Sequence, residues 1–143
     1  MPKWSVTVTQ HLGTEYKMSV TVTALTSNLM ADTLNTAIGT SHKLKLWSAA
    51  DAELATMTYS AASAVVSTSA GAEVLTWAEG NYTDEATANA GTVSYATIET
   101  SGGTEQIRFS DPTNELSLSS LSLSAGDDVN VTADVVVKLP DST

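Results

Sequence analysis

The sequence predicts a mainly β protein: a β-sandwich or jelly-roll-like antiparallel fold, with one short α-helix at about residues 27–38 and an N-terminal β-hairpin. Apolar and polar residues alternate with a period of two along several segments, as in half-buried strands. These segments are short and separated by turn formers, and Ser, Thr and Ala make up 59 of the 143 residues. The length fits a single domain, residues 1–143, in which residues 1–26 form a hairpin or arm used in assembly contacts.

Two strands joined by a turn are predicted at the N-terminus. The chain begins with a Trp-Ser-Val-Thr-Val-Thr segment, in which Trp4, Val6 and Val8 alternate with hydroxyl residues. After Gly13 the alternation resumes from Tyr16. Because Val and Thr branch at Cβ, they fit a pleated strand better than a helix. The segment therefore predicts a β-hairpin.

One helix is predicted, over residues 27–38. Ser27 can cap the free amides of its first turn, and Gly39 supplies the left-handed residue that ends it. A helix of about three turns is marginal in isolation, so we expect its apolar face to lie on a sheet. The predicted apolar face consists of Met30, Leu34, Ala37 and Ile38.

Strands and turns alternate from residue 43 to the end of the chain. The clearest hairpin signal is the Ser-Gly-Gly-Thr turn at residues 101–104, where glycine permits a positive φ. Residues 81–89 are polar and rich in turn formers, so they are predicted to form a loop. Together with the N-terminal pair, about nine strands are predicted. The later strands are expected at residues 43–47, 54–59, 74–77, 92–100, 105–110, 115–123 and 129–139.

The net charge of −10 is distributed unevenly. Up to Leu46 the net charge is +2, and from Trp47 onward it is −12. Nucleic-acid binding depends on clustered Lys and Arg, so the composition argues against a nucleic-acid partner. The chain has no run of about 18 apolar residues and no basic region followed by an apolar stretch. We therefore expect no membrane span, no signal peptide, and synthesis in a cytoplasm.

Residues suited to catalysis are scarce, so we expect that the protein is not an enzyme. It has no Cys, and its two histidines are His11, in the predicted hairpin turn, and His42, in a loop before a strand. Both are expected to be exposed, and neither lies in a Gly-x-Ser-x-Gly context. The Gly102-Gly103 pair precedes a strand and has no following Lys-Ser/Thr, which argues against a phosphate-binding loop. No cofactor is expected.

Acidic loops leave weak calcium binding open. Hard cations take several oxygen ligands, but the sequence contains no Asp-x-Asp-x-Asp-Gly loop. No metal site is assigned, although two loops could supply ligands: Asp111, Asn114 and Glu115, or Asp127, Asp128 and Asn130.

The three tryptophans, in a chain with one Phe, are expected to be mainly pillars of the core. Trp4 is the best candidate for an interface residue because it is close to a terminus. An alternative of another class is a carbohydrate-binding fibre module, which would use Trp47, Trp77 and Tyr82 on an exposed face.

Several motifs follow one another in a fixed order along the chain: the helix at residues 28–39, Lys-Leu-Lys-Leu at 43–46, Leu-Ala-Thr-Met-Thr at 54–58, residues 86–93 with Ser-Gly-Gly-Thr at 101–104, and a Leu-x-Leu strand with Ser-Ala-Gly-Asp-Asp at 124–128. This order of elements resembles a family of small virion proteins of tailed bacteriophages, encoded among head and tail genes. The similarity covers about four-fifths of the chain, whereas the family pattern usually begins near the helix and lacks the preceding two strands.

The resemblance implies a virion structural protein. The preferred interpretation is a capsid decoration (cement) protein, which would lie on the capsid surface and stabilise the head by multivalent contacts with the major capsid protein. A tail tube, tail terminator or neck component is the alternative. Decoration proteins often cap threefold positions, so we expect contacts between copies of the chain and favour a trimer.

The hairpin is the expected assembly element, because an exposed hairpin can add its edge to a neighbour's sheet. The residues assigned to this interface are Lys3, Trp4, Val6, Val8, Tyr16, Lys17 and Met18.

Overall fold

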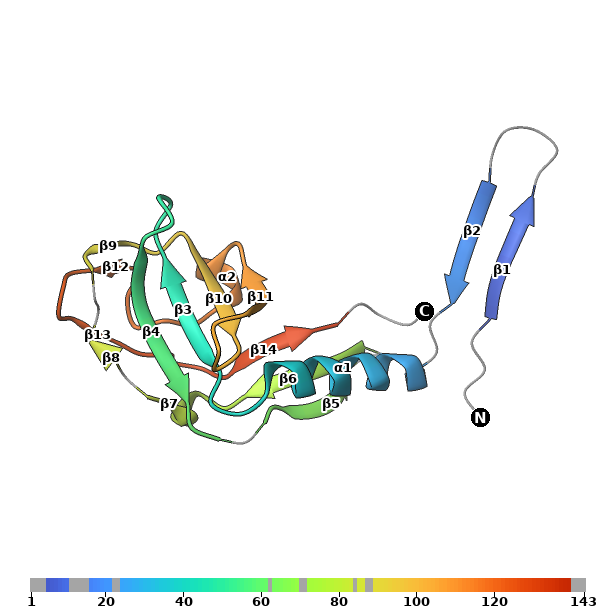
Figure 1. Cartoon of the computed structure of the whole chain (residues 1–143), viewed down its shortest axis with the longest axis horizontal. Coiled ribbons are helices and arrows are strands. Elements are labelled where there is room, and N and C mark those ends of the chain that lie inside the picture. Colours follow the sequence, from blue (N-terminus) through green and yellow to red (C-terminus); the bar gives the residue numbers. More distant parts are fainter. Residues whose placement is uncertain are drawn as a thin grey trace.

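The computed structural model describes residues 5–10, 16–21, 24–61, 63–69, 72–83, 85–86 and 89–139. Within these residues the chain forms antiparallel sheets, one long helix α1 (Ala24–Ile38) and one short helix α2 (Pro112–Glu115). The predicted mainly β class is confirmed. Figure 1 shows the sheets and α1 gathered in one body, with the first two strands standing apart from it.

The largest sheet has five antiparallel strands in the order β11-β10-β3-β4-β7. In β3, Leu44 and Leu46 are buried and alternate with Lys43, Lys45 and Trp47, which are half-buried. This period of two is the sequence pattern that predicted the strand. The strands are β3 (Lys43–Trp47), β4 (Glu53–Tyr59), β7 (Tyr82–Thr83), β10 (Tyr95–Glu99) and β11 (Glu105–Phe109).

A second sheet has three strands in the order β14-β6-β5, with β6 (Ala72–Trp77) between β5 (Val65–Ser69) and β14 (Val135–Lys138). Two shorter pairings complete the body: β9 (Gly91–Thr92) with β12 (Ser122–Leu123), and β8 (Glu85–Ala86) with β13 (Asp128–Val129). A single 3₁₀ turn, η1 (Glu79–Asn81), leads from β6 into β7.

The helix α1 begins at Ala24, three residues before the predicted start, so Ser27 lies inside the helix and is not its cap. The predicted apolar face is confirmed for Ile38, which is buried, and for Leu34, which is half-buried and packs against the core. It is wrong for Met30 and Ala37, which are exposed, and Ala31 is buried in their place. Sequence spacing alone allows several faces, and packing against β6 and β11 selects this one. The predicted end is confirmed, because Gly39 has φ +72°.

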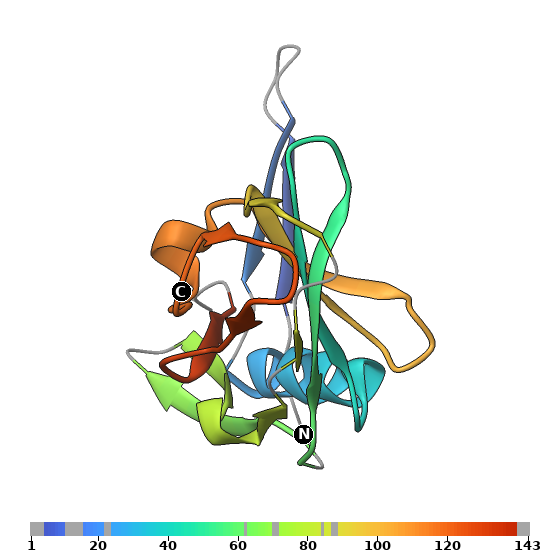
Figure 2. The ribbon, with the colours of Figure 1, turned by 90° about the vertical axis from the view of Figure 1, so that its left-hand side faces the viewer.

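The core lies between the two larger sheets and is closed by α1. Figure 2, turned by 90°, shows α1 beside β6 at the base of the five-stranded sheet. Each of the three parts contributes fully buried side chains to one apolar cluster: Leu44, Leu46, Met57 and Ile98 from the five-stranded sheet, Leu75, Trp77 and Val135 from the three-stranded sheet, and Ala31 and Ile38 from α1.

Several strand predictions are wrong. Residues 81–89 contain the short strands β7 and β8, and β5 at residues 65–69 was not predicted at all. The predicted strand 115–123 is mostly irregular, with an isolated bridge at Leu118 and two strand residues at its end. Serine hydroxyls there bond to nearby backbone: Ser119 accepts from the amide of Asn130, and Ser120 donates to the carbonyl of Ser122. The bond between Ser120 and Ser122 is local and competes with a strand ladder, whereas Ser119 and Asn130 are also joined by a backbone hydrogen bond.

The predicted final strand, residues 129–139, is also divided. Its first residue belongs to β13, and the rest of the strand structure is β14, so that residues 130–134 connect two different sheets. At the end of this connection, the Asp134 carboxylate accepts a hydrogen bond from the amide of Glu79 at 3.0 Å.

The predicted N-terminal hairpin is confirmed. Strands β1 (Ser5–Gln10) and β2 (Tyr16–Thr21) pair antiparallel, with Val6 opposite Val20 and Val8 opposite Met18. Their most extensive contacts are with each other. The residues predicted to form the turn, including His11, lie outside the described residues.

Candidate interaction surfaces

The outer face of the five-stranded sheet carries a connected set of polar and aromatic side chains, which we call the polar face. It projects from three neighbouring strands, because positions 45 and 97 are paired across β3 and β10, and Arg108 is paired with Thr97 across β10 and β11. The polar face consists of Lys45, Trp47, Glu53, Tyr95, Thr97, Glu99 and Arg108.

Lys45 is shared by two carboxylates of the polar face. Its Nζ lies 2.9 Å from Oε2 of Glu53 and 3.4 Å from Oε2 of Glu99. The hydrogen bond to Glu53 raises the pKa of Lys45. Burial opposes ionisation of Glu53, but the hydrogen bonds from Lys45 and Thr56 outweigh it and lower the pKa of this carboxyl. The single positive charge of Lys45 thus stabilises both carboxylates.

The network continues beneath Trp47. The indole Nε1 donates to Oγ1 of Thr97 at 2.9 Å, and this hydroxyl donates to Oε1 of Glu99 at 3.1 Å. Thr97 and Glu99 are only 0% and 6% exposed, although they lie on the outer side of the sheet. Lys45 and Trp47 thus cover a layer of bonded polar groups.

We expect Lys45→Met to lower the free energy of unfolding by about 2 kcal/mol, because the Glu99 carboxylate loses its cation while it stays nearly buried. This figure is below that for a fully buried pair, since Glu53 is partly exposed and screened by water. Urea unfolding measures the change. Lys43→Met is the matched control on the same strand and face, and an equal loss in both variants would contradict the role given to the network.

An aromatic row crosses the same face. The rings of Trp47 and Tyr95 are stacked with centroids 6.0 Å apart, and the Arg108 guanidinium lies 4.5 Å from the Tyr95 centroid. Arg108 is held by two hydrogen bonds to Glu105, and the Tyr95 hydroxyl donates to Asp51 at 2.9 Å. Because β10 lies between β3 and β11, Tyr95 has Trp47 on one side and Arg108 on the other. Its ring is therefore already engaged within the chain.

A buried aromatic cluster joins the two larger sheets. His42, at the start of β3, stacks on Tyr59 with centroids 4.6 Å apart and meets the edge of Trp77 at 5.6 Å. Its Nε2 lies 3.1 Å from the Tyr82 hydroxyl. His42 is 0% exposed, so the prediction of an exposed loop histidine is wrong. The sequence reveals only a loop position, and the burial comes from rings that are distant along the chain.

Burial lowers the pKa of His42 to about 4, and the backbone of Gly39 offsets only part of this effect. Nδ1 of His42 and Nε1 of Trp77 have no well-placed hydrogen-bond partner among the described residues. The cluster is sealed from solvent, which argues against His42 as a catalytic base.

The same cluster corrects the carbohydrate-binding alternative. Trp77 and Tyr82 are 0% and 7% exposed, so two of its three proposed aromatic residues are absent from the surface. Trp47 is half-buried and bonded to Thr97. The expectation of a core pillar is confirmed for Trp77, while Trp4 lies outside the described residues.

A third feature is a row on the three-stranded sheet, in which two exposed valines flank a half-buried threonine; we call Val65, Thr76 and Val136 the valine row. The register places Val65 on β5 and Val136 on β14 opposite the same residue of β6, Thr76. Val65 is 68% exposed and Val136 is 48% exposed. Together with Met30 they are the large hydrophobic residues that are exposed in the described part of the chain.

The seven predicted interface residues fall into two groups. Lys3 and Trp4 lie outside the described residues. Val6, Val8, Tyr16, Lys17 and Met18 occupy β1 and β2, and the register pairs position 6 with 20, 8 with 18 and 10 with 16. The strand period of two therefore places the apolar positions of both strands on one side of the hairpin. The valine row and the polar face were not predicted, because cross-strand register is not visible in the sequence.

The two acidic loops are occupied by local hydrogen bonds. Glu115 accepts from the amide of Asp111 at 2.8 Å, and Asp111 accepts from the side chain of Asn114 at 2.7 Å. In the second loop Asp127 accepts from the amide of Ser124. No group of three or more His, Cys, Asp or Glu suited to hold a metal ion occurs among the residues that the structure describes.

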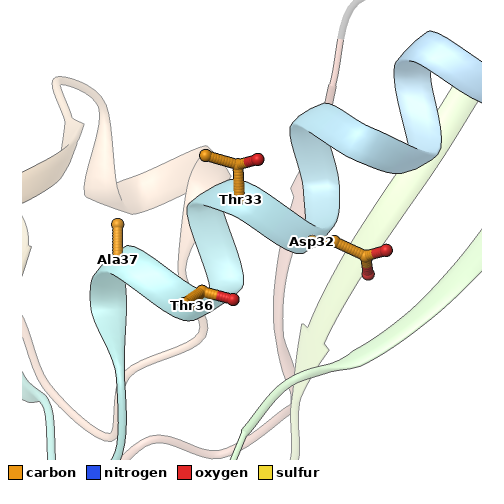
Figure 3. A pocket seen from close by; sticks show the side chains of 4 residues that line it. All are labelled: Asp32, Thr33, Thr36 and Ala37. Carbon is orange, nitrogen blue, oxygen red and sulfur yellow. The ribbon is translucent and has the colours of Figure 1, made fainter.

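A shallow hollow of about 480 Å³ lies on the exposed side of α1 and is lined by Asp32, Thr33, Thr36 and Ala37. Figure 3 shows Thr33 and Ala37 pointing to one side of the helix and the Asp32 carboxylate pointing elsewhere. The lining groups therefore do not converge on a ligand.

Comparison with known proteins gives no match, whether the chain is scanned against protein-family models or searched against curated proteins and solved structures. Within the described residues, no helix is both long and apolar enough to cross a membrane.

Proposed function

We propose that the chain is a virion structural protein of a tailed bacteriophage, and specifically a capsid decoration protein that lies on the capsid surface and stabilises the head through many contacts with the major capsid protein. In this proposal it acts by binding and not by catalysis, and it uses no cofactor. The resemblance in the order of elements is one support. A non-enzymatic role is supported by the sealed environment of His42, the histidine that the structure describes.

The N-terminal hairpin is the observation that carries the proposal. Strands β1 and β2 pair with each other, and Figure 1 shows them outside the body of the chain. A two-stranded hairpin is at best marginally stable alone in water, so a hairpin of this kind needs another surface to cover its apolar side. Residues 1–26 carry a net charge of +1, whereas the remaining residues carry −11. A basic arm on an acidic body suits contact with another subunit.

A tail tube, tail terminator or neck component remains the second candidate. It is supported by the same hairpin, because a projecting element that binds a different surface of the next subunit builds rings as readily as it binds a shell. The position of the protein in an imaged particle separates the two locations.

Removing residues 1–23 is expected to abolish binding to capsids while the body stays folded. The cut is placed after residue 23 because α1 begins at Ala24. Full-length and shortened proteins would be mixed with capsids that lack the protein, and the bound fraction measured by sedimentation with the particles. Circular dichroism and thermal unfolding of the shortened protein check its fold. A folded, shortened protein that still saturates the particles would disprove the role of the arm.

A further inference from the structure

We propose that the hairpin of one copy lies flat on the valine row of a second copy, so that subunits join through two unlike surfaces. This inference names the partner surface of the arm and rests on the assembly role proposed above.

The valine row is a suitable receiving surface. It crosses three adjacent strands, β5, β6 and β14, so its exposed side chains lie in a line on a continuous sheet. Val and Thr have few rotamers to lose when a partner covers them. Its two valines are 68% and 48% exposed, so covering them with a partner is favourable because apolar surface is removed from water.

The hairpin is a matching second layer. Its apolar positions 6, 8, 18 and 20 face each other in two in-register pairs, Val6 with Val20 and Val8 with Met18. Two sheets with such faces pack about 10 Å apart with their side chains interdigitated. The hairpin thus has Val and Met at paired register positions, and the row is of similar apolar character.

Charge favours this pairing. The valine row is bordered by Glu79, which follows the end of β6, and by Asp134, which precedes β14, and both are exposed. The hairpin segment carries Lys3 and Lys17 against one acid. Lys138, at the other end of β14, is the basic residue near the row. Two acidic bodies would repel each other, whereas a basic arm is attracted to the acidic border.

The short connection between β2 and α1 indicates that the hairpin covers the valine row of a second copy and not that of its own chain. Helix α1 lies on the side of β6 that carries Leu75 and Trp77, since these residues share a core cluster with Ala31 and Ile38. Thr76 alternates with Leu75 and Trp77 along β6, so the valine row is on the opposite side.

A hairpin lying flat on that opposite side would be two layers from α1, or about 20 Å. Residues 22 and 23 alone separate β2 from α1, and three peptide steps span at most about 11 Å. A second copy can bring its hairpin to this face without that restriction.

Because the hairpin and the row are different surfaces, each copy can give one hairpin and receive another. Contacts of this kind close into a ring when the rotation between copies allows it, and a trimer is one such ring. The proposal therefore predicts self-association of the full chain in the absence of capsids.

The test uses the full-length protein and sedimentation velocity over a range of concentrations. Val136→Lys is expected to weaken self-association by about tenfold or more, the equivalent of about 1.4 kcal/mol per contact. Met30→Lys is the matched control, because it also replaces an exposed apolar side chain and adds the same charge, but lies on α1. A monomeric full-length protein, or equal weakening by both variants, would overturn the proposal.

Crosslinking tests the contact directly. Because the chain has no cysteine, each introduced Cys is the single thiol of its protein. Val8→Cys and Val136→Cys proteins, mixed and treated with a short thiol-to-thiol crosslinker, are expected to give a mixed dimer that neither protein gives alone. The Thr7→Cys protein, changed at a position on the other side of the hairpin, is expected to give much less. No mixed dimer in either combination would count against the contact.

Capsid binding by the same variants separates this inference from the proposed function. Self-association through the row without capsid binding would leave the inference standing and remove the decoration role. If the protein stays monomeric and Val136→Lys binds capsids as well as the unchanged protein, the decoration role stands and the second-copy contact is overturned. Loss of capsid binding by Val136→Lys in a protein that never self-associates would assign the row to the capsid protein and overturn the second-copy contact.

Discussion

Trp77→Ala is expected to lower the free energy of unfolding by about 3–5 kcal/mol, the usual range when a large aromatic side chain is removed from a core. Trp77 is fully buried, belongs to β6 and meets the edge of His42, which precedes β3. Its ring therefore fills space between the two larger sheets. Because small side chains are so abundant in this chain, few neighbours can move in to fill the cavity.

Urea unfolding followed by circular dichroism measures this change, with the midpoint and the slope reported separately. Trp77→Phe is the matched control. It keeps an aromatic ring and removes the indole Nε1, which has no hydrogen-bond partner among the described residues. We expect Trp77→Phe to lower the free energy of unfolding by less than half as much as Trp77→Ala does. A loss below about 1 kcal/mol for Trp77→Ala would mean that the two sheets do not depend on this side chain.

Acidification from pH 7 to pH 4 is expected to remove about 3 kcal/mol of stability through His42 alone. The pKa of His42 is lowered from 6.5 to about 4 by burial. Between these values the unfolded chain binds the proton and the folded chain does not, so stability falls as the pH drops. The contribution is complete above about pH 6.5 and is lost by about pH 4.

The Tyr82 hydroxyl is the hydrogen-bond partner of the neutral His42 ring. Burial raises the pKa of Tyr82, so its hydroxyl stays protonated and can donate to Nε2 of His42. If His42 is protonated, its Nε2–H can donate to the Tyr82 oxygen instead, so this hydrogen bond does not oppose protonation. The penalty is therefore the desolvation of a positive charge inside an apolar cluster.

The direct measurement is an NMR titration of the His42 ring, with the unfolding free energy determined over the same pH range. A titration midpoint close to 6.5 for His42 would contradict the prediction. Glu53 and Glu105 also have lowered pKa values, so their contributions are lost at still lower pH. His42→Phe serves as the control, because it should flatten the pH dependence between 6.5 and 4 while the carboxylate part below remains.

The sequence predicts best the elements whose pattern is local. The Lys-Leu-Lys-Leu-Trp alternation locates β3 within its observed bounds, and the helix end at Gly39 follows from one residue's backbone freedom. The Ser-Gly-Gly-Thr turn is likewise local, and Gly103 there has φ +87°. These features need no knowledge of the rest of the chain.

The features that the sequence does not reveal are those that depend on contacts between residues far apart in the chain. The alternation of Ser and Leu in residues 117–123 indicates an apolar side but does not reveal the pairing partner, which is the segment 130–132. His42 is buried by rings from β4, β6 and β7, which are remote in sequence. The valine row needs the register of three strands to be recognised, and its two valines are 71 positions apart in the chain.

The polar face has a consequence for the way the molecule meets a surface. Lys45 lies against both Glu53 and Glu99, and Arg108 lies against Glu105, so the cations of this face are paired within the chain and its charged groups can stay in contact with water. The valine row has no such internal compensation. The polar face belongs to another sheet, so it would stay in contact with water when the valine row is covered by the hairpin of a second copy. The turn between β10 and β11 belongs to the same sheet and is exposed at residues 101–104, so a peptide inserted there would be accessible to solvent.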